Sequence, residues 1–215
     1  MKGYLIIFLL LPLSFFGQAP FSDSTLDAGI DNIYDVYQGL FGGGVVAFDY
    51  DNDGYEDLFI TGGQGQDVLY KNNGDTTFKY VTKESGLFKD RMIVTTGVSS
   101  ADVNKDGFID LFVTTIASQA DQSKKKKTLA SNLLYINNGD GTFSDFSSKY
   151  GISKNNFSTS SSFGDINADG YPDLFVGNYF KNFYFEDSPF NTHNIALLNH
   201  YSCLLYTSDA ADESV

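Results

Sequence analysis

The sequence predicts an all-β protein that forms part of a β-propeller, built from four-stranded antiparallel blades. Three observations predict it. An aspartate-rich loop occurs three times, a second motif containing Asn-Asn-Gly-Asp occurs twice, and short runs of β-branched and aromatic residues flank both. Asn-Gly is a strong hairpin signal because both central residues of the turn can take positive φ. A β-sandwich or a β-solenoid is the alternative arrangement of the same strands.

Each repeat is expected to contain four short strands. In the first repeat, we expect them at 43–48, 58–61, 68–71 and 78–81. The aspartate loop joins the first two strands, and an Asn-Gly turn joins the last two. In the third repeat, the third strand is expected to start at Leu197-Leu198-Asn199. One such sheet cannot bury both of its faces, so neighbouring sheets must stack. The blades are expected at about 31–87, 88–152 and 153–202.

A further copy of the fourth-strand signal stands ahead of the first repeat. Residues 21–30 parallel 78–87 and 143–152. Because a propeller ring is closed when a leading strand completes the last blade, we expect 21–30 to be a closing strand. Propellers typically have about four to eight blades, so three blades are expected to form an open arc with an exposed edge.

The two ends of the chain are expected to lie outside the propeller. Residues 1–19 indicate a secretory signal peptide: Lys2 precedes an apolar run, Tyr4 to Phe16, that is too short to span a bilayer. We place its cleavage near Gly17; a buried strand is the alternative for this run. Residues 203–215 resemble the translation of a sequencing-library adapter, so we expect the natural reading frame to be interrupted near residue 202 and exclude this segment from the fold.

The spacing of the aspartate loops predicts calcium binding. Oxygen atoms at positions 1, 3, 5, 7 and 9 of a tight loop can converge on one cation, and a glycine at position 6 permits the turn. The seventh position contributes its backbone carbonyl. The expected ligands are Asp49, Asp51, Asp53, Tyr55 and Asp57 in the first loop, Asp102, Asn104, Asp106, Phe108 and Asp110 in the second, and Asp165, Asn167, Asp169, Tyr171 and Asp173 in the third.

Other readings of these loops are less favoured. An EF-hand needs Glu at position 12, where the three loops have Ile60, Val113 and Val176. Magnesium requires strict octahedral geometry with retained water, so calcium fits better. The alternative is a set of Asp/Asn/Gly-rich turns without any ion. Three copies at matching positions favour Ca²⁺ with a structural role, pinning the first two strands of each repeat together.

Both motifs resemble the FG-GAP/VCBS-type repeats, and among them the cartilage acidic protein-like (ASPIC/UnbV-associated) proteins. The resemblance covers about residues 21–202 and rests on Asp-x-Asp/Asn-x-Asp-Gly-x-x-Asp-Leu-Phe and Leu-Tyr-x-Asn-Asn-Gly-Asp-Gly-Thr-Phe. It implies a propeller of seven blades related to the integrin α-subunit head, with calcium in the hairpin loops and a binding role outside the cell. Thr76 departs from the second motif, which has glycine there, as at Gly141.

The function expected from these features is binding. A net charge of −13 leaves no basic face for nucleic acid. Long loops on a rigid scaffold tend to carry binding sites, and the loops of the second and third repeats contain Lys124 to Lys127 and the aromatic residues Tyr179, Phe183, Tyr184 and Phe185. The alternatives are a solvated lysine run and aromatics that pack beneath their own loop.

We therefore expect a secreted or cell-surface protein that acts as an adhesion or recognition module for an extracellular glycan or protein. His193 and His200 are the only histidines and have no partners at informative spacing, so no catalytic residue is expected. The alternative is a secreted enzyme on a propeller scaffold, a polysaccharide lyase or hydrolase.

Overall fold

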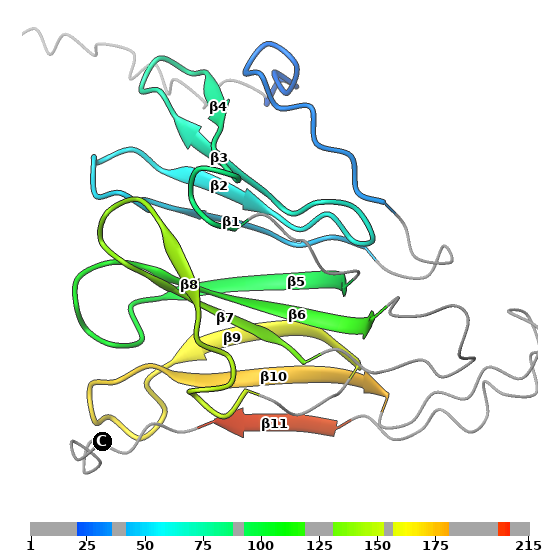
Figure 1. The fold of residues 1–215 in the computed structure, drawn as a ribbon, viewed down its shortest axis with the longest axis vertical. Helices are drawn as coiled ribbons and strands as arrows, with labels where there is room; N and C mark the ends of the chain where they lie inside the picture. The colour runs from blue at the N-terminus through cyan, green and yellow to red at the C-terminus, as the bar shows by residue number, and fades with distance from the viewer. Residues whose placement is uncertain are drawn as a thin grey trace, which may run out of the picture.

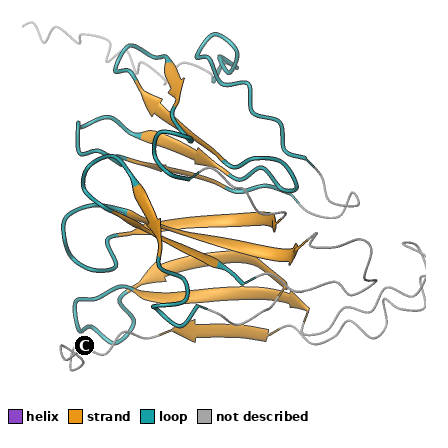
Figure 2. Ribbon diagram, viewed as in Figure 1, coloured by secondary structure: helices purple, strands orange, loops and turns teal. Residues whose placement is uncertain are grey.

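The computed structural model describes residues 21–35, 42–87, 93–118, 131–152, 157–180 and 202–206. Within these ranges all regular structure is β-strand and no helix is present (Figure 2). None of the described residues belongs to a helix able to cross a membrane. The all-β prediction is confirmed for this part of the chain.

The first repeat forms one antiparallel sheet in sequence order. Its strands are β1 (Val45–Phe48), β2 (Asp57–Ile60), β3 (Val68–Asn72) and β4 (Phe78–Tyr80). β-branched and aromatic residues fill these strands, and the turns between them are rich in glycine, asparagine and aspartate. Each strand lies within two residues of its predicted place, so the predicted up-and-down blade is confirmed.

The second repeat forms an equivalent four-stranded sheet. Its strands are β5 (Ile93–Ala101), β6 (Asp110–Ser118), β7 (Leu133–Asn137) and β8 (Phe143–Asp145). The two sheets share one register, because Leu58 pairs with Tyr70 in the first and Leu111 pairs with Tyr135 in the second. The two Leu-Tyr motifs therefore occupy the same place in their blades.

The third sheet differs from the prediction at its outer strand. It contains β9 (Phe157–Gly164), β10 (Asp173–Phe180) and β11 (Ser202–Tyr206) in the order β11-β10-β9. Leu174 pairs with Tyr206, so Leu205-Tyr206 takes the place expected for Leu197-Leu198 and includes residues that we expected outside the fold. An open edge of unpaired backbone groups accepts any β-prone segment, so this pairing carries no information on the origin of residues 203–215.

The leading segment also differs in part. Residues 25–29 form a turn, and no strand is assigned within 21–30. The blade that a closing strand would complete is not among the described residues, so the closing role stays a prediction. The repeat equivalence itself is real: the Phe78 amide donates to Ala28 O at 2.8 Å, and the Phe143 amide donates to Ser85 O at 2.8 Å. The leading segment thus contacts the first blade as the turn after β4 contacts the second, and the shared signal belongs to this turn.

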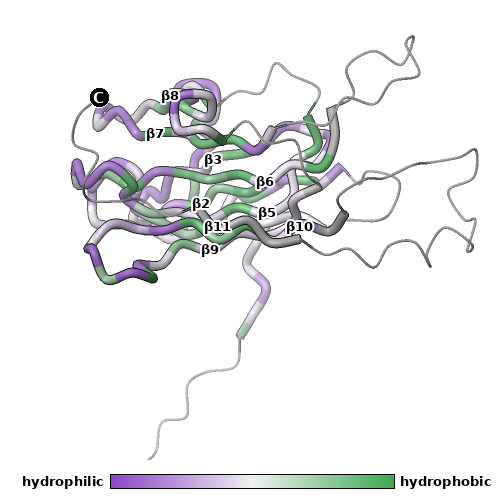
Figure 3. The backbone as a smooth tube through the Cα atoms, turned by 90° about the horizontal axis from the view of Figure 1, so that it is seen from below, coloured by the Kyte–Doolittle hydropathy of each residue, from purple (hydrophilic) through white to green (hydrophobic). Residues whose placement is uncertain are grey.

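The three sheets stack face to face, with the second between the other two (Figure 1). Alternation along β6 decides which core each side chain joins. Leu111 and Val113 pack with Phe59 of the first sheet, whereas Phe112 packs with Leu174 of the third. Hydrophobic stretches follow the strands, and hydrophilic residues gather in the loops at one end of them (Figure 3). A strand buried on both faces needs both alternating sets to be apolar.

Small and hydroxylated residues let neighbouring sheets approach closely at β1, β5 and β9. The Thr61 hydroxyl donates to Thr96 O at 2.7 Å, and the Thr96 hydroxyl donates to Ser158 O at 2.8 Å. A Cβ at Gly44 would lie 2.9 Å from Gly97 Cα of the second sheet. We call this the inter-sheet seam. Side chains larger than these would separate the sheets.

Several sequence-based expectations fall on residues outside the described ranges. They are the signal peptide at 1–19, the lysine run at 124–127, the aromatic residues at 183–185, the two histidines at 193 and 200, the segment 197–199 and residues 207–215.

Candidate metal centre

The three aspartate loops lie at the same end of their sheets (Figure 1). Loop one (49–57) joins β1 to β2, loop two (102–110) joins β5 to β6, and loop three (165–173) joins β9 to β10. The Asn-Gly turns lie beside them, because a Cβ at Gly74 would be 2.7 Å from the Tyr55 ring and one at Gly139 would be 2.8 Å from the Phe108 ring. In the first two sheets, the aspartate loop and the Asn-Gly turn therefore lie together at one end of the sheet.

The ninth position of each loop is a buried carboxylate that holds backbone together. Asp57, Asp110 and Asp173 are 0%, 0% and 1% exposed. The Tyr50 amide donates to Asp57 Oδ2 at 3.0 Å, and the Asn72 amide donates to Asp57 Oδ1 at 2.7 Å. One side chain therefore ties the start of the loop to the end of β3.

Loop two repeats this arrangement. The Val103 amide donates to Asp110 Oδ2 at 2.9 Å, and the Asn137 amide donates to Asp110 Oδ1 at 2.8 Å. In loop three, the Ile166 amide donates to Asp173 Oδ2 at 2.8 Å. The ninth aspartate was predicted only as a cation ligand. The structure adds a second role, which is to bind the loop and the third strand to one another.

Burial makes the charged form of these carboxylates costly. It raises the pKa of Asp57 and of Asp110 to about 6, although the backbone amides that each accepts favour the charged form. The nearby carboxylates of the same loop contribute to this rise in pKa. A divalent cation among these oxygens would offset both the burial and the repulsion.

The first position accepts the backbone of the turn. In loop one, the Asp53 and Gly54 amides donate to the two oxygens of Asp49 at 3.0 and 2.8 Å. The equivalent bonds to Asp102 measure 3.1 and 2.9 Å, and those to Asp165 measure 3.1 and 2.8 Å. Gly54 has a φ of 90°, which explains the glycine at position 6. The three loops thus share one backbone conformation.

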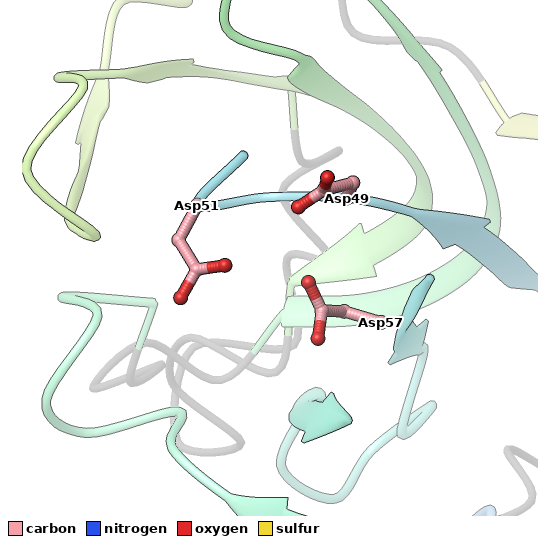
Figure 4. A group of neighbouring side chains, drawn as sticks. All are labelled: Asp49, Asp51 and Asp57. Carbon is pink, nitrogen blue, oxygen red and sulfur yellow. The ribbon is translucent and has the colours of Figure 1, made fainter. Parts of the chain in front are cut away.

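Loop one brings three predicted ligands together. One oxygen atom from each of Asp49, Asp51 and Asp57 can be chosen so that all three lie within 4.8 Å of one another (Figure 4). Asp51 Oδ1 is buried and has no hydrogen-bond partner. A buried carboxylate oxygen without a partner, in a residue grouped with two other carboxylates, is poorly satisfied by protein alone. These residues fit a hard cation, which takes six to eight oxygen ligands.

Asp53 is not part of this cluster, because its carboxylate faces elsewhere. Its Oδ1 accepts the Tyr55 amide at 3.0 Å, and its Oδ2 lies 2.8 Å from the Lys71 ammonium. The same ammonium contacts Asp51 Oδ2. The hydrogen bond from Lys71 lowers the pKa of Asp53. Burial lowers the pKa of Lys71, but the bonds and charges of the two aspartates outweigh it, so this pKa is raised.

Loops two and three have asparagine at position 3 and a different internal arrangement. Asn104 Nδ2 donates to Asp106 Oδ2 at 2.8 Å, and Asn167 Nδ2 donates to Asp169 Oδ2 at 2.9 Å. The amides of Phe108 and Tyr171 donate to the other oxygen of these aspartates at 2.9 and 2.8 Å. In the described residues, a cluster of three mutually close carboxylates occurs only in loop one.

The family comparison agrees with this repeat structure. A family model described as FG-GAP-like repeat matches residues 49–113 and 116–176, together more than half of the chain. The chain belongs to the FG-GAP-like repeat family. Comparison with curated proteins gives no match. The first matched segment begins at Asp49, the first residue of loop one, and the second ends at Val176 in β10, so together they contain all three loops.

Neighbouring FG-GAP repeats are connected through their loops. Asn52 Nδ2 of loop one donates to Gly107 O of loop two at 3.0 Å, and the Lys105 ammonium of loop two lies 3.7 Å from the centroid of the Tyr171 ring in loop three. Asn137 Nδ2 donates to Tyr50 O at 2.8 Å. Sequence reasoning missed these contacts, because each joins residues of different repeats.

Lys71 was also missed, although the repeat alignment contains a signal for it. The Leu-Tyr motif is followed by Lys71 in the first FG-GAP repeat and by Ile136 in the second. Position 3 of the loop is Asp51 in the first repeat and Asn104 in the second. The added carboxylate and the added ammonium occur in the same repeat, and the structure shows that they are in contact.

Proposed function

We propose that this FG-GAP-like repeat protein binds Ca²⁺ in its aspartate loops and uses the stiffened blades as an extracellular adhesion or recognition module. The supporting observation is the cluster of Asp49, Asp51 and Asp57, with its buried and unpartnered Asp51 Oδ1. Calcium prefers carboxylate and carbonyl oxygens and tolerates irregular geometry, which suits such a loop.

The residues that would hold an ion are those at positions 1, 3, 5, 7 and 9 of each loop. The repeated backbone conformation of the three loops supports assigning the same role to all of them. An ion would neutralise the buried carboxylate at position 9, which already joins the loop to the third strand in the first two blades. Calcium would therefore stabilise each blade by holding its first three strands together.

Calcium is expected to raise the thermal stability of the chain. For a dissociation constant on the order of 10⁻³ M, a tenfold excess of calcium stabilises the protein by about 1.4 kcal/mol per occupied loop. Three loops would raise the Tm by roughly 10 °C. Differential scanning calorimetry in EDTA and in about 10 mM CaCl₂ measures this shift, with MgCl₂ at the same concentration as the control.

The number of ions is checked separately. Asp165→Asn removes one charge and keeps only one of the two oxygen acceptors that the Asp169 and Gly170 amides use, so titration calorimetry should show one fewer calcium ion bound than in the unchanged chain. A Tm that is the same in EDTA, magnesium and calcium, with no heat of binding, would contradict the proposal.

The proposed role outside the cell rests on the sequence. The signal-like segment 1–19 supports secretion or surface display, and the resemblance to cartilage acidic protein-like proteins supports a propeller of seven blades with an extracellular glycan or protein ligand. We regard residues 203–215 as adapter-derived and assign the function to 20–202. We assign the chain no catalytic step, and the loop carboxylates serve structure in this proposal.

Glycan-array binding tests the recognition role. The unchanged chain is expected to bind a subset of the immobilised glycans in the presence of calcium, and this binding is expected to disappear in EDTA. Incubation with the same polysaccharides, followed by measurement of new reducing ends or unsaturated products, separates binding from cleavage. Calcium-dependent cleavage would replace our proposal with a lyase or hydrolase, and retention that is unaffected by EDTA would separate recognition from calcium.

A further inference from the structure

Lys71 distinguishes loop one from the other two loops. Its side chain extends from β3, contacts Asp51 Oδ2 and lies 2.8 Å from Asp53 Oδ2. In loops two and three, Oδ2 of the aspartate at position 5 accepts a hydrogen bond from a side-chain amide of the same loop, that of Asn104 or Asn167. Loop one has an aspartate at position 3, whose side chain has no N–H to donate. The donor to Asp53 Oδ2 is therefore the Lys71 ammonium of the neighbouring strand β3.

Counted over the ligand positions and the lysine that contacts them, the exchange keeps the formal charge of loop one equal to that of the other two; Glu56 of loop one and Lys105 of loop two lie outside this count. Loop one has four aspartates at its ligand positions and one lysine beside them, which gives a formal charge of −3. Loops two and three each have three aspartates at these positions, which also gives −3. Asp51 and Lys71 thus add one negative and one positive charge together, and without Lys71 loop one would have the strongest repulsion of the three.

The ammonium is nevertheless an incomplete counter-ion. It satisfies Asp51 Oδ2 but leaves Asp51 Oδ1 buried without a partner. The oxygens of Asp49 and Asp57 lie within 4.8 Å of a ligand atom of Asp51, and none of the ion pairs of Lys71 involves them. A divalent ion that used Asp51 and Asp53 fully would have to compete with the lysine for the same carboxylates.

We propose that Lys71 is a tethered counter-ion of loop one, which orders this loop in the absence of metal and which a divalent ion must displace. The ordering role stands on the ion pairs alone, and the displacement rests on the proposed calcium function. Loop one is therefore ordered at low calcium by the chain itself and has a lower affinity for calcium than its four carboxylates would otherwise give. The flexible lysine stem allows the ammonium to leave without movement of β3.

Hydrogen exchange in EDTA tests the ordering role. Lys71→Met should increase exchange at 49–57 about tenfold, because the loop loses both of its ion pairs to β3, and should leave 102–110 and 165–173 unchanged. Lys79→Met is the matched control. Lys79 is exposed and lies opposite Lys71 in the register of β3 and β4, and its substitution by methionine removes the same charge. Lys71→Arg should retain protection. Equal exchange in the Met variant and the unchanged chain would overturn the proposal.

A calcium titration followed by the same exchange measurement tests displacement. In Lys71→Met, the calcium concentration at half-protection of loop one should fall about tenfold, while the midpoints of loops two and three stay constant. If those two loops respond to calcium but the loop one midpoint is unchanged or higher, displacement is wrong. If no loop of the unchanged chain responds, the calcium proposal fails, and the EDTA measurement still decides the ordering role.

Discussion

Asp110→Ala is expected to lower the free energy of unfolding by about 3 kcal/mol, in EDTA as well as in calcium. The substitution leaves the amides of Val103 and Asn137, which bond to Asp110 at 2.9 and 2.8 Å, without their acceptor in a site that is 0% exposed. A buried donor without a partner costs about 1–3 kcal/mol. Relief of the burial that raises the pKa of Asp110 to about 6 returns a part of this. Urea denaturation measures the difference.

Asp140→Ala is the matched control. Asp140 also accepts two hydrogen bonds, from the Thr142 amide at 3.0 Å and the Thr142 hydroxyl at 2.6 Å, but it is exposed. Water replaces such an acceptor, so the expected loss is below about 1 kcal/mol. Equal losses in the two variants would mean that burial does not decide the cost. A loss at Asp110 that disappears in EDTA would mean that this residue acts only as a metal ligand.

Gly44→Ala is expected to destabilise the chain by about 3 kcal/mol, because overpacking costs are largest where backbone must move. The added Cβ would lie 2.9 Å from Gly97 Cα, Thr96 O and Val98 N, all backbone atoms of the second sheet. Relief requires the first two sheets to separate at the inter-sheet seam. Denaturation in urea and a shift of the tyrosine fluorescence report this separation.

Gly164→Ala provides the comparison for Gly44. Gly164 lies at the end of β9, and a Cβ there would meet nothing within 4 Å. Alanine has a slightly better strand preference than glycine, so the expected change is within about 0.5 kcal/mol. If both alanine variants lose stability equally, backbone entropy rather than sheet spacing governs the effect, and the seam as described is wrong.

The strands and loops of each repeat were predictable because their causes are local. Asp49 and Gly54 lie five positions apart and determine one tight turn, and the same spacing recurs in each loop. The run Leu111-Phe112-Val113 directly after loop two predicted a strand there. The turn at 25–29 was not predicted as a turn, because the similarity of Phe21 to the strand residues Phe78 and Phe143 indicated a strand.

The candidate site was predictable only in part. The positions of the carboxylates followed from spacing, and three of them meet in loop one as expected. The sequence did not indicate that Asp57 and Asp110 hold backbone amides of the third strand, because these bonds join residues 15 and 27 positions apart. β11 was not predictable either. The unpaired backbone groups at the open edge of β10 can bond to any β-prone segment that lies beside them, whatever its sequence motif.

The residues alone determined that the chain forms repeated antiparallel hairpins with acidic loops, because turn geometry and strand alternation depend on neighbours within a few positions. Only the folded chain decided which loops are in contact and which lysine side chain lies against each loop. Asn137 reaches Tyr50 O across 87 positions, and Lys71 reaches Asp51 from another strand. Such contacts arise when stacked sheets bring distant backbone within hydrogen-bond distance, a consequence of core burial that no local pattern encodes.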